Sequence, residues 1–128
     1  MYIRIEPESK TPIYTQLIYQ IKTGILRKEL LPGETLPSVR SLARDIGINM
    51  HTVNKAYKRL QEEGVLIQDK KAFLVNPSQQ IDVPDEVNRD FEERFEELLI
   101  DAKIFRMTND TMEQLKEKIE VRLKKGES

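Results

Sequence analysis

Two neighbouring stretches in the first half of the chain carry apolar residues at helical spacing. The apolar positions are Val39, Leu42, Ala43 and Ile46 in the first stretch, and Val53, Ala56, Tyr57 and Leu60 in the second. This spacing gives each predicted helix one apolar stripe to bury. Ser38 and Asn49 stand where a helix start needs a capping side chain, and Gly47 and Gly64 stand where a helix ends. Two short helices joined by a tight turn are typical of a helix-turn-helix.

The polar side of the second helix carries side chains that suit contact with DNA. These residues are Asn49, His51, Thr52, Asn54, Lys55, Lys58 and Arg59. The start of a recognition helix meets the major groove, where amide and imidazole groups reach base edges and lysines reach phosphates. The same pattern is also typical of the solvated face of any two-helix corner. Spacing alone therefore leaves both interpretations open.

The segments on either side support the helix-turn-helix. Four-residue spacing of apolar side chains from Ile13 to Ile25 predicts an amphipathic helix that ends near Lys28, with Thr11 as its cap and Pro12 in its first turn. Before this helix, residues 2–6 alternate in a way that suits a short edge strand or an extended arm.

Two short apolar runs after Gly64 predict a β-hairpin. The runs, residues 65–68 and 72–75, are joined by the charged turn Asp69, Lys70 and Lys71. A hairpin directly after a recognition helix is where a winged helix carries its wing. Lys70 and Lys71 at its tip are then expected to contact the DNA backbone.

The last third of the chain predicts a separate helical region. Residues 77–84 are polar, contain two prolines and predict a linker, so we expect domains at 1–76 and 85–128. Two amphipathic helices follow, and a two-helix hairpin is too small to bury both apolar stripes alone. A second copy of the hairpin is the expected cover, and folding back onto the first domain is the alternative. The expected dimer contacts are Phe91, Phe95, Leu98, Leu99, Met112, Leu115 and Ile119.

Composition narrows the function classes further. The chain has 128 residues, no cysteine and a net charge of -1, but residues 1–76 carry +4 and residues 77–128 carry -5. The front part can therefore approach a polyanion. No signal peptide or membrane span is evident, which predicts a cytoplasmic protein without membrane partners. The single histidine, His51, has no catalytic motif around it, so we expect no enzyme, no cofactor and no metal site.

Several of these segments together resemble the N-terminal domain of GntR-type transcriptional regulators. The resemblance rests on PIYTQL at residues 12–17, LPGETLPSVRSLA at 31–43, IG at 46–47, TVNKAYKRL at 52–60 and EEGV at 62–65. The short two-helix C-terminal region is similar to the YtrA subfamily, in which it serves for dimerisation. The expected fold is therefore mainly α with a small β-hairpin: a winged helix-turn-helix followed by a helical dimerisation region.

The resemblance implies a homodimeric repressor that binds a palindromic double-stranded DNA operator. Its DNA contacts carry over onto Arg40, with Ser38 beside it, and onto Asn49, His51, Thr52 and Asn54 at the start of the second helix. Met50 departs from the arginine that many members carry, so an apolar contact or a neighbouring side chain must read that base. The wing has no glycine, which favours backbone contact by Lys70 and Lys71 over minor-groove insertion.

Two questions remain open from the sequence. A winged-helix protein–protein module is the alternative function, although the basic and polar face favours DNA. A small molecule that controls binding is a further open partner, and the short C-terminal region favours a small ligand or none.

Overall fold

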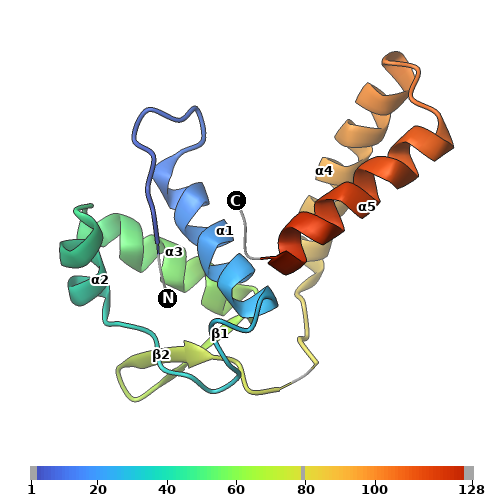
Figure 1. The fold of residues 1–128 in the computed structure, drawn as a ribbon. Helices are drawn as coiled ribbons and strands as arrows, with labels where there is room; N and C mark the ends of the chain where they lie inside the picture. Colours follow the sequence, from blue (N-terminus) through green and yellow to red (C-terminus); the bar gives the residue numbers. More distant parts are fainter. Residues whose placement is uncertain (1–2, 79, 126–128) are drawn as a thin grey trace. The chain divides into compact units, whose positions relative to one another are not determined.

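The computed structural model describes residues 3–78 and 80–125, and it is mainly helical with one β-hairpin, as the sequence predicts (Figure 1). The elements are α1 (Ile13–Leu26), α2 (Val39–Ile46), α3 (Met50–Glu62), β1 (Leu66–Asp69), β2 (Ala72–Val75), α4 (Asp85–Ile104) and α5 (Asn109–Lys125). The chain divides into two compact units, Met1–Asp82 and Val83–Ser128. No helix among the described residues combines the length and the apolar character needed to cross a bilayer.

The first unit has one hydrophobic core, to which every one of its elements contributes. The apolar stripe of α1 contacts that of α3, and α2 packs on α3 from another side. The largest fully buried side chains are Leu17, Ile21, Leu30, Val53, Tyr57, Leu60 and Leu66. All of them except Leu30 and Leu66 belong to the helical stripes that the sequence periodicity predicts. Their burial is the main favourable contribution to folding.

Tyr57 is the largest of the fully buried side chains. Its ring packs edge-on against Phe73 of β2, with ring centroids 5.1 Å apart. Its hydroxyl donates a 2.8 Å hydrogen bond to the backbone carbonyl of Pro37, two residues before α2. Burial raises the pKa of this hydroxyl well above its ordinary range. One side chain of α3 therefore holds both the hairpin and the chain that leads into α2.

The predicted helix punctuation is confirmed in the helix-turn-helix. The Ser38 hydroxyl accepts a hydrogen bond from the Ser41 amide at 3.1 Å, and the Asn49 side chain accepts one from the His51 amide at 2.7 Å. Gly47 ends α2 in the left-handed conformation, with φ of 71°. This is the conformation that glycine adopts without steric cost.

The predicted cap of α1 by Thr11 is wrong. The backbone at Pro12 is still extended, with ψ of 147°, so the helix begins at Ile13 and has no side-chain cap. Thr11 instead offers its backbone carbonyl, which accepts a 2.8 Å hydrogen bond from the side-chain amide of Gln16. A side chain of α1 itself, Gln16, therefore fixes the segment that leads into the helix.

Residues 3–6 form an extended arm beside α1 and no strand. Two glutamines one helical turn apart bond its backbone. Gln16 accepts from the Glu6 amide at 2.8 Å and donates to the Glu6 carbonyl at 3.0 Å. Gln20 pairs in the same way with the amide and carbonyl of Arg4. The backbone of this arm is thus hydrogen-bonded to side chains of α1 and not to a neighbouring strand.

The hairpin is anchored to the unit along its second strand. The strands pair antiparallel in the register Leu66↔Val75 to Asp69↔Ala72. Residues 33–36 bond the other edge of β2, since the Leu36 amide donates to Phe73 at 2.8 Å and the Val75 amide donates to Glu34 at 2.9 Å. Backbone pairing on both sides fixes the direction in which the hairpin projects.

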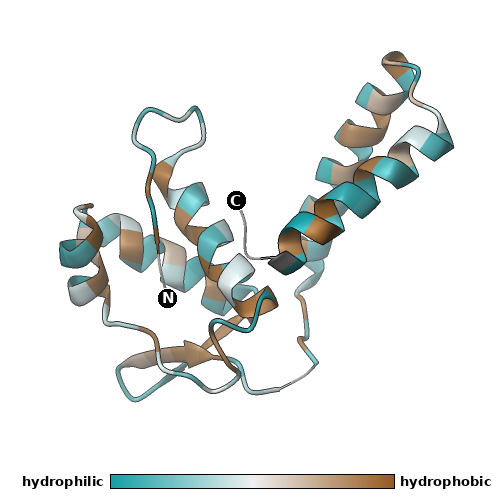
Figure 2. Ribbon diagram, viewed as in Figure 1, coloured by the Kyte–Doolittle hydropathy of each residue, from teal (hydrophilic) through white to brown (hydrophobic). Residues whose placement is uncertain are grey.

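The second unit buries little of its apolar surface. Figure 1 shows α4 and α5 side by side, and Figure 2 shows hydrophobic residues spread along both helices. Among the described residues of this unit, only Ala102 is a buried hydrophobic side chain. Phe91, Phe95 and Leu98 of α4 are 61%, 53% and 65% exposed. The rings of Phe91 and Phe95 stack on each other with centroids 6.5 Å apart.

We expect Tyr57→Phe to lower the free energy of unfolding by about 1 kcal/mol, because the hydrogen bond to Pro37 is lost while the ring still fills the core. Urea denaturation measures the change. Tyr19→Phe is the control, because Tyr19 is 44% exposed and its side chain is open to water. An equal effect of the two substitutions would contradict the structural role of Tyr57.

Comparison of the wild-type protein with the Tyr57→Phe variant also tests a dependence of stability on pH. The unfolded chain releases the Tyr57 proton above about pH 10, whereas the folded chain keeps it, because burial raises the pKa. This contribution to stability is therefore complete below pH 10 and decreases as the pH rises further. Between pH 9 and pH 11 the wild-type protein should lose more stability than the Tyr57→Phe variant.

Candidate nucleic-acid interface

A groove of about 1050 Å³ lies between the first turns of α2 and α3 and the β-hairpin. Six of the predicted DNA-contacting residues line it: Ser38, Arg40, His51, Asn54, Lys70 and Lys71. Their exposed side chains come from three elements that the buried Tyr57 holds together. The groove therefore gathers predicted residues that lie up to 33 positions apart in the sequence, from Ser38 to Lys71.

The first turns of both helices contribute to this groove, and their backbone chemistry suits an anion. The amides in the first turn of a helix lack partners within the helix and carry the positive end of the helix dipole. Ser38 and Asn49 satisfy one such amide in each helix, at Ser41 and His51. Arg40, Lys70 and Lys71 add positive charge to the groove, and Asp69 adds one negative charge.

Five predicted contact residues do not line this groove. They are Asn49, Thr52, Lys55, Lys58 and Arg59. The Lys55 ammonium lies 4.8 Å from the centre of the Tyr14 ring on α1, a cation–π contact that directs it toward that helix. Lys58 lies 5.5 Å from the Phe73 ring centre and donates a 3.4 Å hydrogen bond to Gln68. Both lysines thus pack on their own unit in the free protein.

The structure adds residues that the sequence analysis did not assign to DNA contact. Gln68, Asp69 and Thr35 line the groove beside the predicted set. Thr35 reaches it because residues 33–36 pair with β2, and no local sequence signal indicates this long-range pairing. The position of Gln68 beside the hairpin tip could have been predicted, because it is the last residue of a predicted strand before a charged turn.

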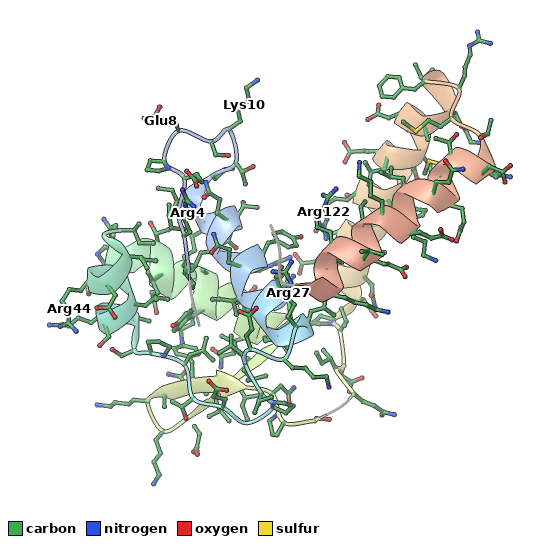
Figure 3. The ribbon with its side chains drawn as sticks, in the orientation of Figure 1. Arg4, Glu8, Lys10, Arg27, Arg44 and Arg122 are labelled. Carbon is green, nitrogen blue, oxygen red and sulfur yellow. The ribbon has the colours of Figure 1, made fainter. Side chains whose placement is uncertain are left out.

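Arg44 lies on α2 outside this groove. Figure 3 shows its side chain at the outer end of α2, directed away from the rest of its unit. Arg44 lies one helical turn after Arg40 but does not line the groove, and its carboxylate neighbour is Asp45 at 3.8 Å. The two arginines therefore form a matched pair for substitution.

The tip of the hairpin is a two-residue turn made of Lys70 and Lys71, between the paired residues Asp69 and Ala72. Lys70 has a φ of 60°, in the left-handed region that costs a residue with a Cβ atom about 1–2 kcal/mol. Tight hairpin turns normally place glycine or asparagine in this conformation. The chain here keeps a lysine, and both ammonium groups are exposed at the tip.

Comparison with known proteins identifies the unit that carries the groove. The profile of the bacterial regulatory proteins of the gntR family matches residues 13–75, which run from α1 to the end of the hairpin. The structure of YtrA from Sulfolobus acidocaldarius, a GntR-family transcription factor, is 43% identical, with a TM-score of 0.59. The match covers 72% of this chain and 94% of that one. The chain belongs to the GntR family.

Two further comparisons place this GntR-family chain more closely. The HTH-type transcriptional repressor YtrA of Bacillus subtilis (strain 168) is 52% identical over 64 residues. That match covers 50% of this chain and 49% of the relative, so the chain spans about half the length of that repressor. A transcriptional antiterminator from Listeria monocytogenes EGD-e has a TM-score of 0.85 at 25% identity, over 100% of this chain and 96% of that one. The chain is thus a YtrA-like member with a winged-helix fold.

We expect Lys70→Gly to raise the free energy of unfolding by about 0.5–1 kcal/mol, because glycine adopts positive φ without strain. Lys71→Gly removes the same charge at a residue whose φ is not positive. That control should lower stability by about 0.5 kcal/mol through the added freedom of the unfolded chain. Thermal denaturation compares the two variants, and equal shifts would mean that the turn at Lys70 is unstrained.

Proposed function

We propose that this chain is a sequence-specific transcriptional regulator, acting as a repressor, that binds a palindromic DNA operator as a homodimer in the cytoplasm. The observation that carries the proposal is the groove, where the first turns of α2 and α3 and the hairpin tip bring basic and polar side chains together. The names of the YtrA relatives support the same function. The alternative, a protein–protein module, would be favoured by an apolar or acidic groove.

The groove residues divide into two kinds by the part of DNA that they suit. Arg40, Lys70 and Lys71 carry the charges that bind phosphate oxygens, which positions the protein without reading sequence. His51 and Asn54 lie on the first two turns of α3, where hydrogen-bonding side chains reach base edges in the major groove. On this proposal His51 serves as a DNA contact and has no catalytic role. The exposed tip lysines contact the backbone beside the operator half-site.

The second unit supplies the dimer contacts in this proposal. Phe91, Phe95 and Leu98 follow one stripe of α4 and are all more than half exposed. Leu99, Leu115 and Ile119, also predicted contacts, are exposed as well, whereas Met112 is half-buried. Exposed apolar clusters of this kind mark interaction surfaces. A two-fold pairing of this unit with its copy covers both stripes at once, because an isologous interface complements itself.

We expect Arg40→Ala to weaken binding to the selected operator about tenfold or more, through loss of a phosphate contact. The operator is first obtained by selection from a random duplex library at two salt concentrations. The slope of log affinity against log salt should decrease by about one for each protomer. Arg44→Ala removes the same group one turn away and should leave affinity and slope nearly unchanged.

Two outcomes would count against the proposed DNA function. Absence of any enriched sequence at either salt concentration would favour the alternative function, a protein–protein module. Equal effects of the substitutions at Arg40 and Arg44 would show that general charge, and not the groove, determines binding.

We expect Phe95→Ser to convert the proposed dimer to a monomer at micromolar concentration, because it removes a half-exposed ring from the middle of the α4 stripe. Light scattering measures the mass of the free protein, and circular dichroism checks that the helices remain. Glu96→Ser, at the next residue of the same helix, is the control and should leave the mass unchanged. A wild-type protein that is monomeric at this concentration would reject the dimer.

A further inference from the structure

Met50 is an unexpected residue for the place that it occupies. It is the first residue of α3 and lines the groove among Ser38, Arg40, His51 and Asn54. Its side chain is 43% exposed, whereas the other large apolar residues of α3 are buried in the core. Within α3, all of whose residues the structure describes, it is the one exposed large hydrophobic side chain.

Packing within the free protein does not explain this methionine. Met50 belongs neither to the buried core nor to the partly buried residues that pack against it. The helix start is already capped by Asn49, so the side chain of Met50 has no capping task. The lining of the groove also includes Leu36, Val39, Ala72 and Phe73, so Met50 extends an apolar part of the groove outward beside Arg40 and His51. Its exposure is therefore better explained by an apolar group on a ligand than by the fold.

The chemistry of the major groove offers one group that matches. A thioether cannot donate a hydrogen bond and is a weak acceptor, so it cannot read the donors and acceptors of guanine, adenine or cytosine well. The C5 methyl group of thymine is the apolar feature on base edges in that groove. Methionine is flexible and polarizable, which suits it to cover a methyl group whose position is fixed by the other contacts.

We propose that Met50 is a specificity-determining residue that contacts the thymine C5 methyl group at one position of each operator half-site. The proposal rests on the proposed DNA function, which supplies the operator. His51 and Asn54 remain the hydrogen-bonding readers of neighbouring bases, while Met50 reads one base by its methyl group alone.

Replacement of thymine by uracil tests this contact, since the two bases differ only in the methyl group. Each thymine of the selected operator is replaced in turn, symmetrically in both half-sites, and the affinity of the full chain is measured. At one position, uracil should weaken binding by about twofold to fourfold per half-site, the factor for one buried methyl group. At the same position, 5-methylcytosine should bind better than cytosine.

Protein variants assign the effect to Met50. Met50→Ala should bind the thymine and uracil duplexes equally, whereas Met50→Leu should keep most of the preference, because leucine also covers a methyl group. Arg40→Ala should weaken binding to both duplexes alike and preserve their ratio. Circular dichroism checks that each variant remains folded.

The outcomes separate this inference from the proposed function. A specific operator at which no uracil replacement changes affinity would overturn the role of Met50 and leave the DNA function intact. A uracil effect that persists in Met50→Ala would assign the methyl group to another residue and would also overturn it. Failure to select any operator would reject both the function and the inference.

Discussion

The groove depends on one buried side chain, Tyr57. Its hydroxyl bonds the Pro37 carbonyl and its ring packs on Phe73, so the start of α2, the body of α3 and the second strand meet at a single residue. A buried hydroxyl without a partner would cost about 1–3 kcal/mol, so the fold that satisfies Tyr57 is favoured over arrangements that do not. The groove is therefore positioned from within the core.

Backbone pairing reinforces the same arrangement from outside the core. Residues 33–36 lead directly into Pro37 and also pair with β2, so the segment before α2 and the hairpin form one connected edge. Movement of the hairpin tip relative to α2 would have to break these hydrogen bonds. A groove held on both sides in this way presents its charges at fixed separations, which favours recognition of regularly spaced phosphates.

The local features of this fold were predictable from sequence, and the long-range ones were not. Apolar spacing identified the helices, and the caps at Ser38 and Asn49 follow from chemistry within three residues. The direction of a long side chain could not be predicted in this way. Lys55 turns toward Tyr14 because α1 and α3 pack together, which is a tertiary contact. The pairing of residues 33–36 with β2 likewise depends on tertiary contacts. Thr11 was misassigned because extended backbone at Pro12 delays α1 by one residue.

The two units differ in how much of their apolar surface they bury. In the proposed function, this difference affects the affinity for DNA. The first unit buries its stripes, so it can present a groove while remaining monomeric, but one groove carries only the three basic residues Arg40, Lys70 and Lys71. Few phosphate contacts give weak binding at physiological salt. If two such units are joined through the exposed stripes of α4 and α5, as proposed, binding of the second half-site becomes intramolecular and takes place at high effective concentration. In the proposed dimer, the incomplete packing of the second unit would then supply the affinity that a single groove lacks.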